Sequence, residues 1–233
     1  MKRLGVVVPM THELKPLLKR VPMQREEIDG RTVHSGKVGD VELKATITMI
    51  GTDVARATTE WVIDNLDVDH VGLIGIAGGL GPDAHIGDLL VPEVVIDYDT
   101  QRETHPTPLG SHVAEGVLYT SGTLIVDQSV LQGLADRGVT AIDMETSAVG
   151  AACEDRGMPW SVFRSLSDHI RDSLIDEAMS KVMTTDGSAN IGKLLRYLAP
   201  NPLRVRKLVK LGLDMTKATN AAANALVESL RSG

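Results

Sequence analysis

Short apolar segments alternate with amphipathic segments along most of this chain, and this alternation limits its fold more than any other feature. Four segments are rich in Val, Ile and Leu over lengths typical of buried strands, namely 4–9, 70–77, 139–144 and 160–166. Strands that are apolar throughout and alternate with helices form parallel sheets that are covered on both faces. We therefore predict a three-layer α/β/α sandwich with a central mixed β-sheet.

The pattern also places the individual elements. We expect a single domain over 1–233, because no linker is visible, with a helical C-terminal segment from about 172. The expected strands are 3–9, two strands within 31–50 that meet in a tight turn at Gly39-Asp40, 70–77 ending in a glycine-rich loop, 88–97, 116–126, 139–144 and 160–166. The expected helices are 11–20, 52–66, 127–137 and 146–156, and a polar loop holds 104–110.

Composition excludes several classes of protein. The formal net charge of -7 argues against a general nucleic-acid binder. The single cysteine, Cys153, cannot form an intrachain disulfide, and we interpret it as a buried structural thiol. The seven histidines show no metal-ligand spacing, so we predict no metal and no cofactor. The N-terminus lacks a signal-peptide pattern, and no apolar run approaches the roughly 20 residues of a membrane span, which predicts a cytoplasmic protein.

Polar or glycine-rich residues follow four of the predicted strands. In open α/β sheets, ligands bind outside the carboxyl ends of the parallel strands. We therefore expect these residues to meet at one edge of the sheet: Glu13, Gly78 with Gly79, Asp143 with Glu145, and Asp168.

Each of these features also has a structural explanation. Asp168 is suited to cap the next helix, Glu145 to complement a helix dipole, and Glu13 to lie on a solvated helix face. The glycines alone imply only a tight turn or a close approach of the backbone. Four such features at the same kind of strand end favour a shared site. No G-x-G-x-x-G motif and no P-loop lysine are present.

Three segments, in order, resemble the nucleoside phosphorylase and nucleosidase superfamily. "GVVVPMTHEL" is similar to its first strand and acidic turn, and "IGIAGGLGPDAHIGDLLVP" to its glycine loop and following strand. "DMETSAVGAACEDRGMPWSVFRSLSD" is similar to its [DE]-M-E and R-x-x-S-D signature. The likeness covers about 4–168 and is greatest to the methylthioadenosine/S-adenosylhomocysteine nucleosidases.

The resemblance implies a role for each matched residue. Asp168 would donate a proton to N7 of the purine, and Glu13 would orient or deprotonate the attacking water. Glu145 would accept hydrogen bonds from the ribose hydroxyls while Met144 packs under the sugar. Arg164 would hold the loop or the anionic side of the site. The remaining substrate-binding positions are Asp143, Ala77, Gly78, Gly79, Ser167, the backbone near Leu124 and Ile125, and Ile175, which would replace an aromatic residue on the 5′ side.

Chemistry supports these roles independently. Cleavage of an N-ribosidic bond builds positive charge on the sugar and negative charge on the base, so an acid for the base and carboxylates near the sugar are both required. Glu13 would repel phosphate, and "GLIGIAGG" contains no arginine, which favours hydrolysis over phosphorolysis. Ile76 departs from this pattern, because nucleosidases usually have a serine or threonine there. We predict release of adenine from a 5′-thio purine nucleoside.

Three alternatives remain open at this point. The first is a phosphate-dependent phosphorylase. The second is a nucleoside-binding module without turnover, which would not need a general acid. The third is a peripheral membrane helix over 203–212, which is locally basic with Val and Leu on one side, against a helix packed on the sheet. The resemblance also implies a homodimer.

Overall fold

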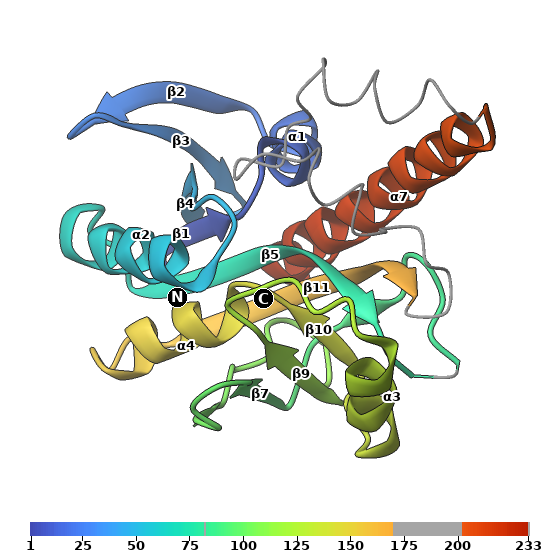
Figure 1. Ribbon diagram of the computed structural model, residues 1–233. Coiled ribbons are helices and arrows are strands. Elements are labelled where there is room, and N and C mark those ends of the chain that lie inside the picture. Colours follow the sequence, from blue (N-terminus) through green and yellow to red (C-terminus); the bar gives the residue numbers. More distant parts are fainter. Residues whose placement is uncertain (82, 170–201, 233) are drawn as a thin grey trace.

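The protein folds around one mixed sheet. The computed structural model describes residues 1–81, 83–169 and 202–232, and the side chains of the last segment from Lys210 on. In these residues the strands follow the order β2-β3-β4-β1-β5-β10-β9-β7-β8, with β11 beside β5 and β6 beside β11 (Figure 1). The strands are β1 (Arg3–Val8), β2 (Met23–Ile28), β3 (Arg31–Val38), β4 (Val41–Ile47), β5 (His70–Gly79), β6 (Leu89–Leu90), β7 (Val94–Asp97), β8 (Glu103–Thr104), β9 (Val117–Thr120), β10 (Ala141–Asp143) and β11 (Trp160–His169).

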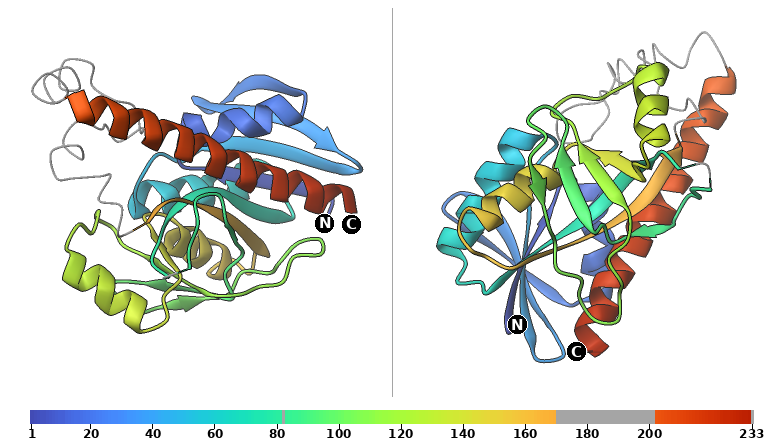
Figure 2. Two further views of the ribbon diagram at one scale, coloured as in Figure 1. Left: turned by 90° about the vertical axis from the view of Figure 1, so that its right-hand side faces the viewer. Right: turned by 90° about the horizontal axis from the view of Figure 1, so that it is seen from below.

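Helices cover both faces of this sheet. On one face α1 (Thr11–Arg20) packs with the long α7 (Pro202–Ser232), and on the other α2 (Thr52–Asn65) packs with α4 (Thr146–Glu154) (Figures 1 and 2). The helix α3 (Gln128–Asp136) packs beside β9 and β10. The predicted three-layer α/β/α sandwich with a mixed sheet is confirmed.

Successive side chains of a strand belong to the hydrophobic clusters on opposite faces of the sheet. In β1, Val7 packs in the cluster that includes α2 and α4, whereas Val6 and Val8 pack in the cluster that includes α1 and α7. Successive side chains of a strand point to opposite faces, so a strand covered on both sides is apolar at every position. This is why "LGVVV" appears in the sequence as an unbroken apolar run.

Strand β5 is the centre of the sheet. It pairs in parallel with β1 along its first half and with β11 along most of its length, and it pairs antiparallel with β10 at Gly78 and Gly79. The prediction that these two glycines form a loop was therefore wrong. A Cβ at Gly78 would lie 3.6 Å from Oδ2 of Asp168 and 3.7 Å from Cγ2 of Ile142. Both are ordinary van der Waals distances, so packing does not require glycine at this position.

Two other predicted strands differ in length from the observed ones. The strand expected over 116–126 ends at Thr120, because Ser121 begins a turn in which its Oγ donates a hydrogen bond to the Thr123 carbonyl. The strand expected over 88–97 is divided into β6 and β7 around Pro92, which has no N–H to donate to a ladder.

Two observed strands, β2 and β8, were not predicted from the sequence. Strand β2 reads "MQREEI" and pairs antiparallel with β3 at the edge of the sheet, with most of its side chains exposed. An edge strand with solvent on both sides has no apolar alternation to reveal it. Strand β8 has only two residues and lies in the loop that was expected to hold 104–110.

The helix predictions were accurate within the described residues. α1, α2, α3 and α4 match the expected ranges to within two residues at each end, and Cys153 is buried on α4 as predicted. Of the helical segment expected from about 172, the part up to residue 201 lies outside the described residues. The basic side chains expected on 203–212 fall mostly outside them as well. Among the described helices, none is both long and apolar enough to span a bilayer.

Packing between α4 and β11 yields a stability prediction. A Cβ at Gly150 would lie 2.6 Å from Cζ2 of Trp160 and 2.6 Å from Oγ1 of Thr104. We expect Gly150→Ala to lower the free energy of unfolding by about 1–3 kcal/mol through overpacking. The control Gly133→Ala, on exposed α3 with no atom near its added Cβ, should raise it by about 0.5–1 kcal/mol. Urea unfolding measures both, and equal effects would contradict this account.

Candidate active site

A fully buried arginine lies at the centre of the candidate site. Arg164 has no exposed side-chain surface and stands on β11 directly opposite Gly75 of β5. A Cβ at Gly75 would overlap Nη1 of Arg164 and lie 2.5 Å from Oε1 of Glu13. Because Gly75 has no side chain, Arg164 and Glu13 can approach each other in the space beside it.

Three buried carboxyl groups surround this guanidinium. Nη2 of Arg164 donates hydrogen bonds to Asp143 and, at 3.0 Å, to Oε2 of Glu145. Nη1 lies 3.9 Å from Oε1 of Glu13. The exposed fractions of the three acids are 2% for Glu13, 5% for Glu145 and 7% for Asp143. We call Arg164, Glu13, Asp143 and Glu145 the carboxylate cluster. The structure thus brings these sequence-predicted residues together beside Gly75 in the interior of β5, with Arg164 from within β11, Asp143 from the end of β10 and Glu13 from α1.

Glu13 is held by the backbone of β5. Its Oε1 accepts a hydrogen bond of 2.8 Å from the Ile76 N–H. Its Oε2 has no hydrogen-bond partner among the described residues, and neither does Nη1 of Arg164. The explanation of Glu13 as a solvated helix acid was wrong, because α1 turns this side chain into the sheet. The two unpartnered groups leave hydrogen-bonding capacity for a small polar molecule.

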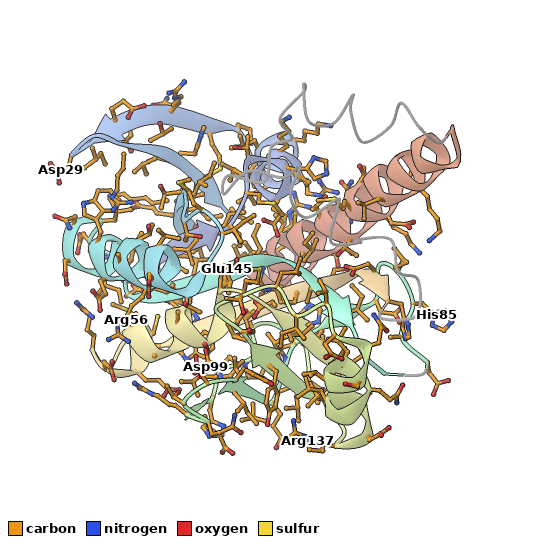
Figure 3. The ribbon with its side chains drawn as sticks, in the orientation of Figure 1. Asp29, Arg56, His85, Asp99, Arg137 and Glu145 are labelled. Carbon is orange, nitrogen blue, oxygen red and sulfur yellow. The ribbon has the colours of Figure 1, made fainter. Side chains whose placement is uncertain are left out.

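Glu145 stands at the N-cap position of α4 but makes no capping hydrogen bond with its side chain. Its Oε1 accepts instead from the Gly51 N–H at 3.1 Å, in the loop that precedes α2. Figure 3 labels Glu145 near the middle of the molecule, whereas Arg56 and Arg137 lie toward its outside. Glu145 therefore points into the site from between α2 and α4.

Asp143 is fixed by hydroxyl groups that the sequence analysis did not select. Oγ1 of Thr120 donates to Oδ1 of Asp143 at 2.6 Å, and the Thr146 hydroxyl donates to Oδ2. The Thr146 N–H donates to Oδ2 as well, at 3.2 Å. Thr120 ends β9, which is parallel to β10, and Asp143 lies two residues before Glu145, the N-cap residue of α4. The predicted strand over 116–126 did not end at Thr120, so the sequence pattern gave no signal for this hydroxyl.

The charge of the cluster is not balanced. Three carboxylates and one guanidinium leave an excess of two negative charges if every group is ionised. Burial raises the pKa of Glu13 to about 8 and that of Glu145 to about 7, although Arg164 lowers both. The cluster therefore takes up protons on its glutamates as the pH falls toward neutral.

Asp168 lies near the end of β11, beside Gly78 of β5. The register of β11 against β5 shifts between Leu166 and Asp168, so that Ser167 is the extra residue and Asp168 pairs with Gly78. The Ser167 hydroxyl donates to Oδ1 of Asp168 at 2.6 Å. The Asp168 side chain is half-buried, and its Oδ2 lies over Gly78. A bulge of this kind changes the direction in which a side chain points.

The other predicted site residues range from buried to exposed. Ala77, Gly79 and Ser167 are buried in β5 and β11, and Met144 is half-buried between β10 and α4. Ile125 is half-buried and Leu124 is 45% exposed, in the turn after β9. That turn reaches the start of α2, because a Cβ at Gly122 would lie 3.4 Å from Oγ1 of Thr52. Ile175 lies outside the described residues.

A separate cavity lies away from the carboxylate cluster. It has a volume of about 460 Å³ and none of the cluster residues lines it; among its described lining residues are Ala84, Leu90, His112, Glu115 and Thr140. Glu13 and Glu145 identify the candidate site more directly than this cavity, since burial strongly raises the pKa values of both. The described residues contain no group of three or more His, Cys, Asp or Glu arranged to hold a metal ion.

Fold and buried acids together describe an α/β protein with a carboxylate-lined site, and comparison identifies its family. The family model of the phosphorylase superfamily matches residues 3–112 and 102–199. The chain belongs to this superfamily, which confirms the resemblance found in its motifs.

Curated relatives in this family are named as nucleosidases. The aminodeoxyfutalosine nucleosidase of Helicobacter pylori strain J99 is 26% identical in an alignment 199 positions long that covers 72% of this chain and 86% of the relative. The 5′-methylthioadenosine/S-adenosylhomocysteine nucleosidase of Chromohalobacter salexigens is also 26% identical in an alignment of 199 positions, which covers 72% of this chain and 85% of the relative.

Solved structures share the fold. The 5′-methylthioadenosine/S-adenosylhomocysteine nucleosidase of Neisseria meningitidis, in complex with methylthio-immucillin-A, matches with a TM-score of 0.76, 15% identity and 100% coverage of both chains. The futalosine hydrolase of Helicobacter pylori strain 26695 matches with a TM-score of 0.72 and 18% identity, covering 98% of this chain and 97% of the other.

The raised pKa of Glu13 predicts a pH dependence of stability. Folding favours its protonated form, so this contribution is full below the ordinary pKa of 4.5 and is lost as the pH rises to about 8. We expect the free energy of unfolding to fall by several kcal/mol over this interval and Glu13→Gln to remove most of that fall. Urea unfolding as a function of pH measures it, with exposed Glu42→Gln as the control. An identical fall in Glu13→Gln and the unsubstituted protein would contradict the assignment.

Proposed function

We propose that this protein is an N-ribosyl hydrolase that cleaves adenine from a 5′-substituted purine nucleoside. The observation that carries the proposal is the buried pair formed by Glu13 and Arg164, whose Oε2 and Nη1 both lack hydrogen-bond partners among the described residues. A water molecule between them would be held by one acceptor and one donor. Membership of the phosphorylase superfamily and the names of the curated relatives support the same reaction.

In the proposed reaction the bond between C1′ and N9 breaks while the water oxygen bonds to C1′. Glu13 takes the proton of the water, and Asp168 gives a proton to N7, so that adenine leaves as a neutral base. With a pKa of about 8, Glu13 is a stronger base than an exposed carboxylate and still ionises near neutral pH. Glu145, held at 3.1 Å by the Gly51 N–H, accepts hydrogen bonds from the ribose hydroxyls and stabilises the positive charge on the sugar.

The charges favour water over phosphate as the nucleophile. Phosphate would enter a cluster that already carries an excess of acidic groups around its one arginine. Ile76 offers no hydroxyl, so its contribution to the water site is indirect, through the N–H that orients Glu13. We infer that Glu13 and Arg164 replace the hydroxyl that this position usually supplies in nucleosidases.

The names of the relatives indicate which 5′ substituents to consider. Relatives at the same 26% identity are named for aminodeoxyfutalosine and for 5′-methylthioadenosine/S-adenosylhomocysteine. All three compounds carry adenine on a ribose, which matches the proposed roles of Asp168 and Glu145. We propose that the protein takes a member of this group, with 5′-methylthioadenosine and S-adenosylhomocysteine as the first candidates.

The direct test is release of adenine from these three nucleosides and from adenosine, and of hypoxanthine from inosine, each with and without phosphate. We expect release that is independent of phosphate and yields free ribose products. Release that requires phosphate would make the protein a phosphorylase. Binding of a nucleoside without release of the base would support the binding-module alternative instead.

Substitution of the proposed acid separates catalysis from binding. We expect Asp168→Asn to lower kcat by about 10²–10⁴-fold, because the leaving base loses its proton donor, while the Kd for the nucleoside stays within a few fold. Stopped assays of adenine release and calorimetric titration measure the two quantities. Asp40→Asn, at the fully exposed turn between β3 and β4, is the matched control. An unchanged kcat in Asp168→Asn would show that another group protonates the base.

A further inference from the structure

Asp143 differs from the other acids of the cluster in how completely its oxygens are used. Oδ1 accepts from the Thr120 hydroxyl, and Oδ2 accepts from the Thr146 hydroxyl, the Thr146 N–H and Arg164. Glu13, by contrast, retains an oxygen without a partner among the described residues. A carboxylate with this many donors is tightly oriented and has little capacity left for a ligand.

Arg164 is oriented by the same groups. Its Nε donates to the Thr146 hydroxyl at 3.1 Å, and its Nη2 donates to both Asp143 and Glu145. These contacts occupy one edge of the planar guanidinium. The remaining nitrogen, Nη1, is thereby directed to the side where Glu13 lies 3.9 Å away.

The support for Asp143 extends into the neighbouring strands. The Ser147 N–H donates to the Thr120 hydroxyl at 2.9 Å, which leaves the hydrogen of that hydroxyl for Asp143. The Ser147 side chain points elsewhere, to Oδ2 of Asp97 at 2.9 Å. Strand β9, the end of β10 and the first turn of α4 therefore converge on one carboxylate.

We propose that Asp143, held by Thr120 and Thr146, is a positioning residue that fixes the Arg164 guanidinium between Glu145 and Glu13. This inference rests on the proposed function in naming the reaction that Arg164 serves. The sequence predicted that Asp143 binds the substrate directly, and we assign it a positioning role instead. Asp143 acts through Arg164, which faces the water site, and through the charge that Arg164 presents to the two glutamates.

A displaced Arg164 would be detected through the titration of the charged groups around it. Besides Asp143 these are Glu13 from α1 and Glu145 before α4, and Asp97 of β7 is connected to Asp143 through Ser147 and Thr120. Arg164 favours the ionised form of both glutamates. If Arg164 moves away, both carboxyls should titrate at higher pH.

The test uses variants that change no charge. Thr120→Val removes the hydroxyl that orients Asp143 and keeps the shape of the side chain, whereas Thr120→Ser keeps the hydroxyl. Ser147→Ala is the matched control, since it removes a hydroxyl bonded to Asp97 and retains the N–H that meets Thr120. The glutamate titrations are followed by carboxyl ¹³C NMR in the ligand-free protein, and kcat and KM are measured beside them.

We expect Thr120→Val to raise the titration midpoints of Glu13 and Glu145 by about half a pH unit or more. We also expect it to lower kcat by about tenfold, with KM within about threefold. Thr120→Ser and Ser147→Ala should behave as the unsubstituted protein does. Should Thr120→Val not fold, Thr146→Val against Thr146→Ser makes the same comparison from the other side of Asp143.

Unchanged midpoints in the valine variants would overturn the inference, whatever happens to turnover. A rise in KM without a fall in kcat would also overturn it, because that is the result expected of direct contact with the substrate. The NMR titration needs no substrate and so separates the two proposals. Shifted midpoints in a protein that releases no base would support the positioning role while the proposed function fails.

Discussion

The buried guanidinium of Arg164 is the constraint on which the rest of the site depends. An isolated charge inside a sheet is strongly unfavourable, so the guanidinium is stable there only with carboxylates and hydrogen-bond acceptors around it. Asp143, Glu145 and Thr146 supply them. Gly75 supplies the space, because any larger residue at that position would overlap the guanidinium. The Arg164 side chain, from β11, thus contacts residues of β5, β10 and α4.

The three acids around Arg164 are not equivalent. Asp143 is saturated with donors, and its negative charge opposes ionisation of neighbouring Glu145. Glu13 and Glu145 are more weakly held, and burial raises the pKa values of both toward neutrality. A cluster divided in this way provides one carboxyl that is fully occupied by hydrogen-bond donors and two glutamates whose pKa values lie nearer neutrality. That division suits a site that must stabilise positive charge and move a proton at the same pH.

Strand β5 is the element that brings the residues of the site together. It pairs with β1, β10 and β11, so Glu13 after β1, Asp143 at the end of β10 and Arg164 within β11 are brought together even though they are far apart in the chain. Its small residues allow this. Gly75 admits the guanidinium, and the Ile76 N–H orients Glu13. Packing beside the site therefore explains Gly75 of the glycine-rich stretch.

The sequence by itself determined the layers, most helix and strand positions, and the strand ends at which Glu13, Asp143, Glu145 and Asp168 lie. Apolar periodicity is a local property, and the rule that ligands bind at the carboxyl ends of strands needs only the order of elements. The polar edge strand β2 carried no such signal and was missed.

Only the tertiary structure decided which groups face one another. That Thr120 bonds Asp143, that Gly75 stands opposite Arg164, and that Gly78 and Gly79 lie within a strand all depend on sheet register. Register is set by pairing between residues far apart in the chain, and a shift of one residue would turn Arg164 to the opposite face. The pattern of a single segment cannot specify it, because pairing of each strand depends on its neighbours.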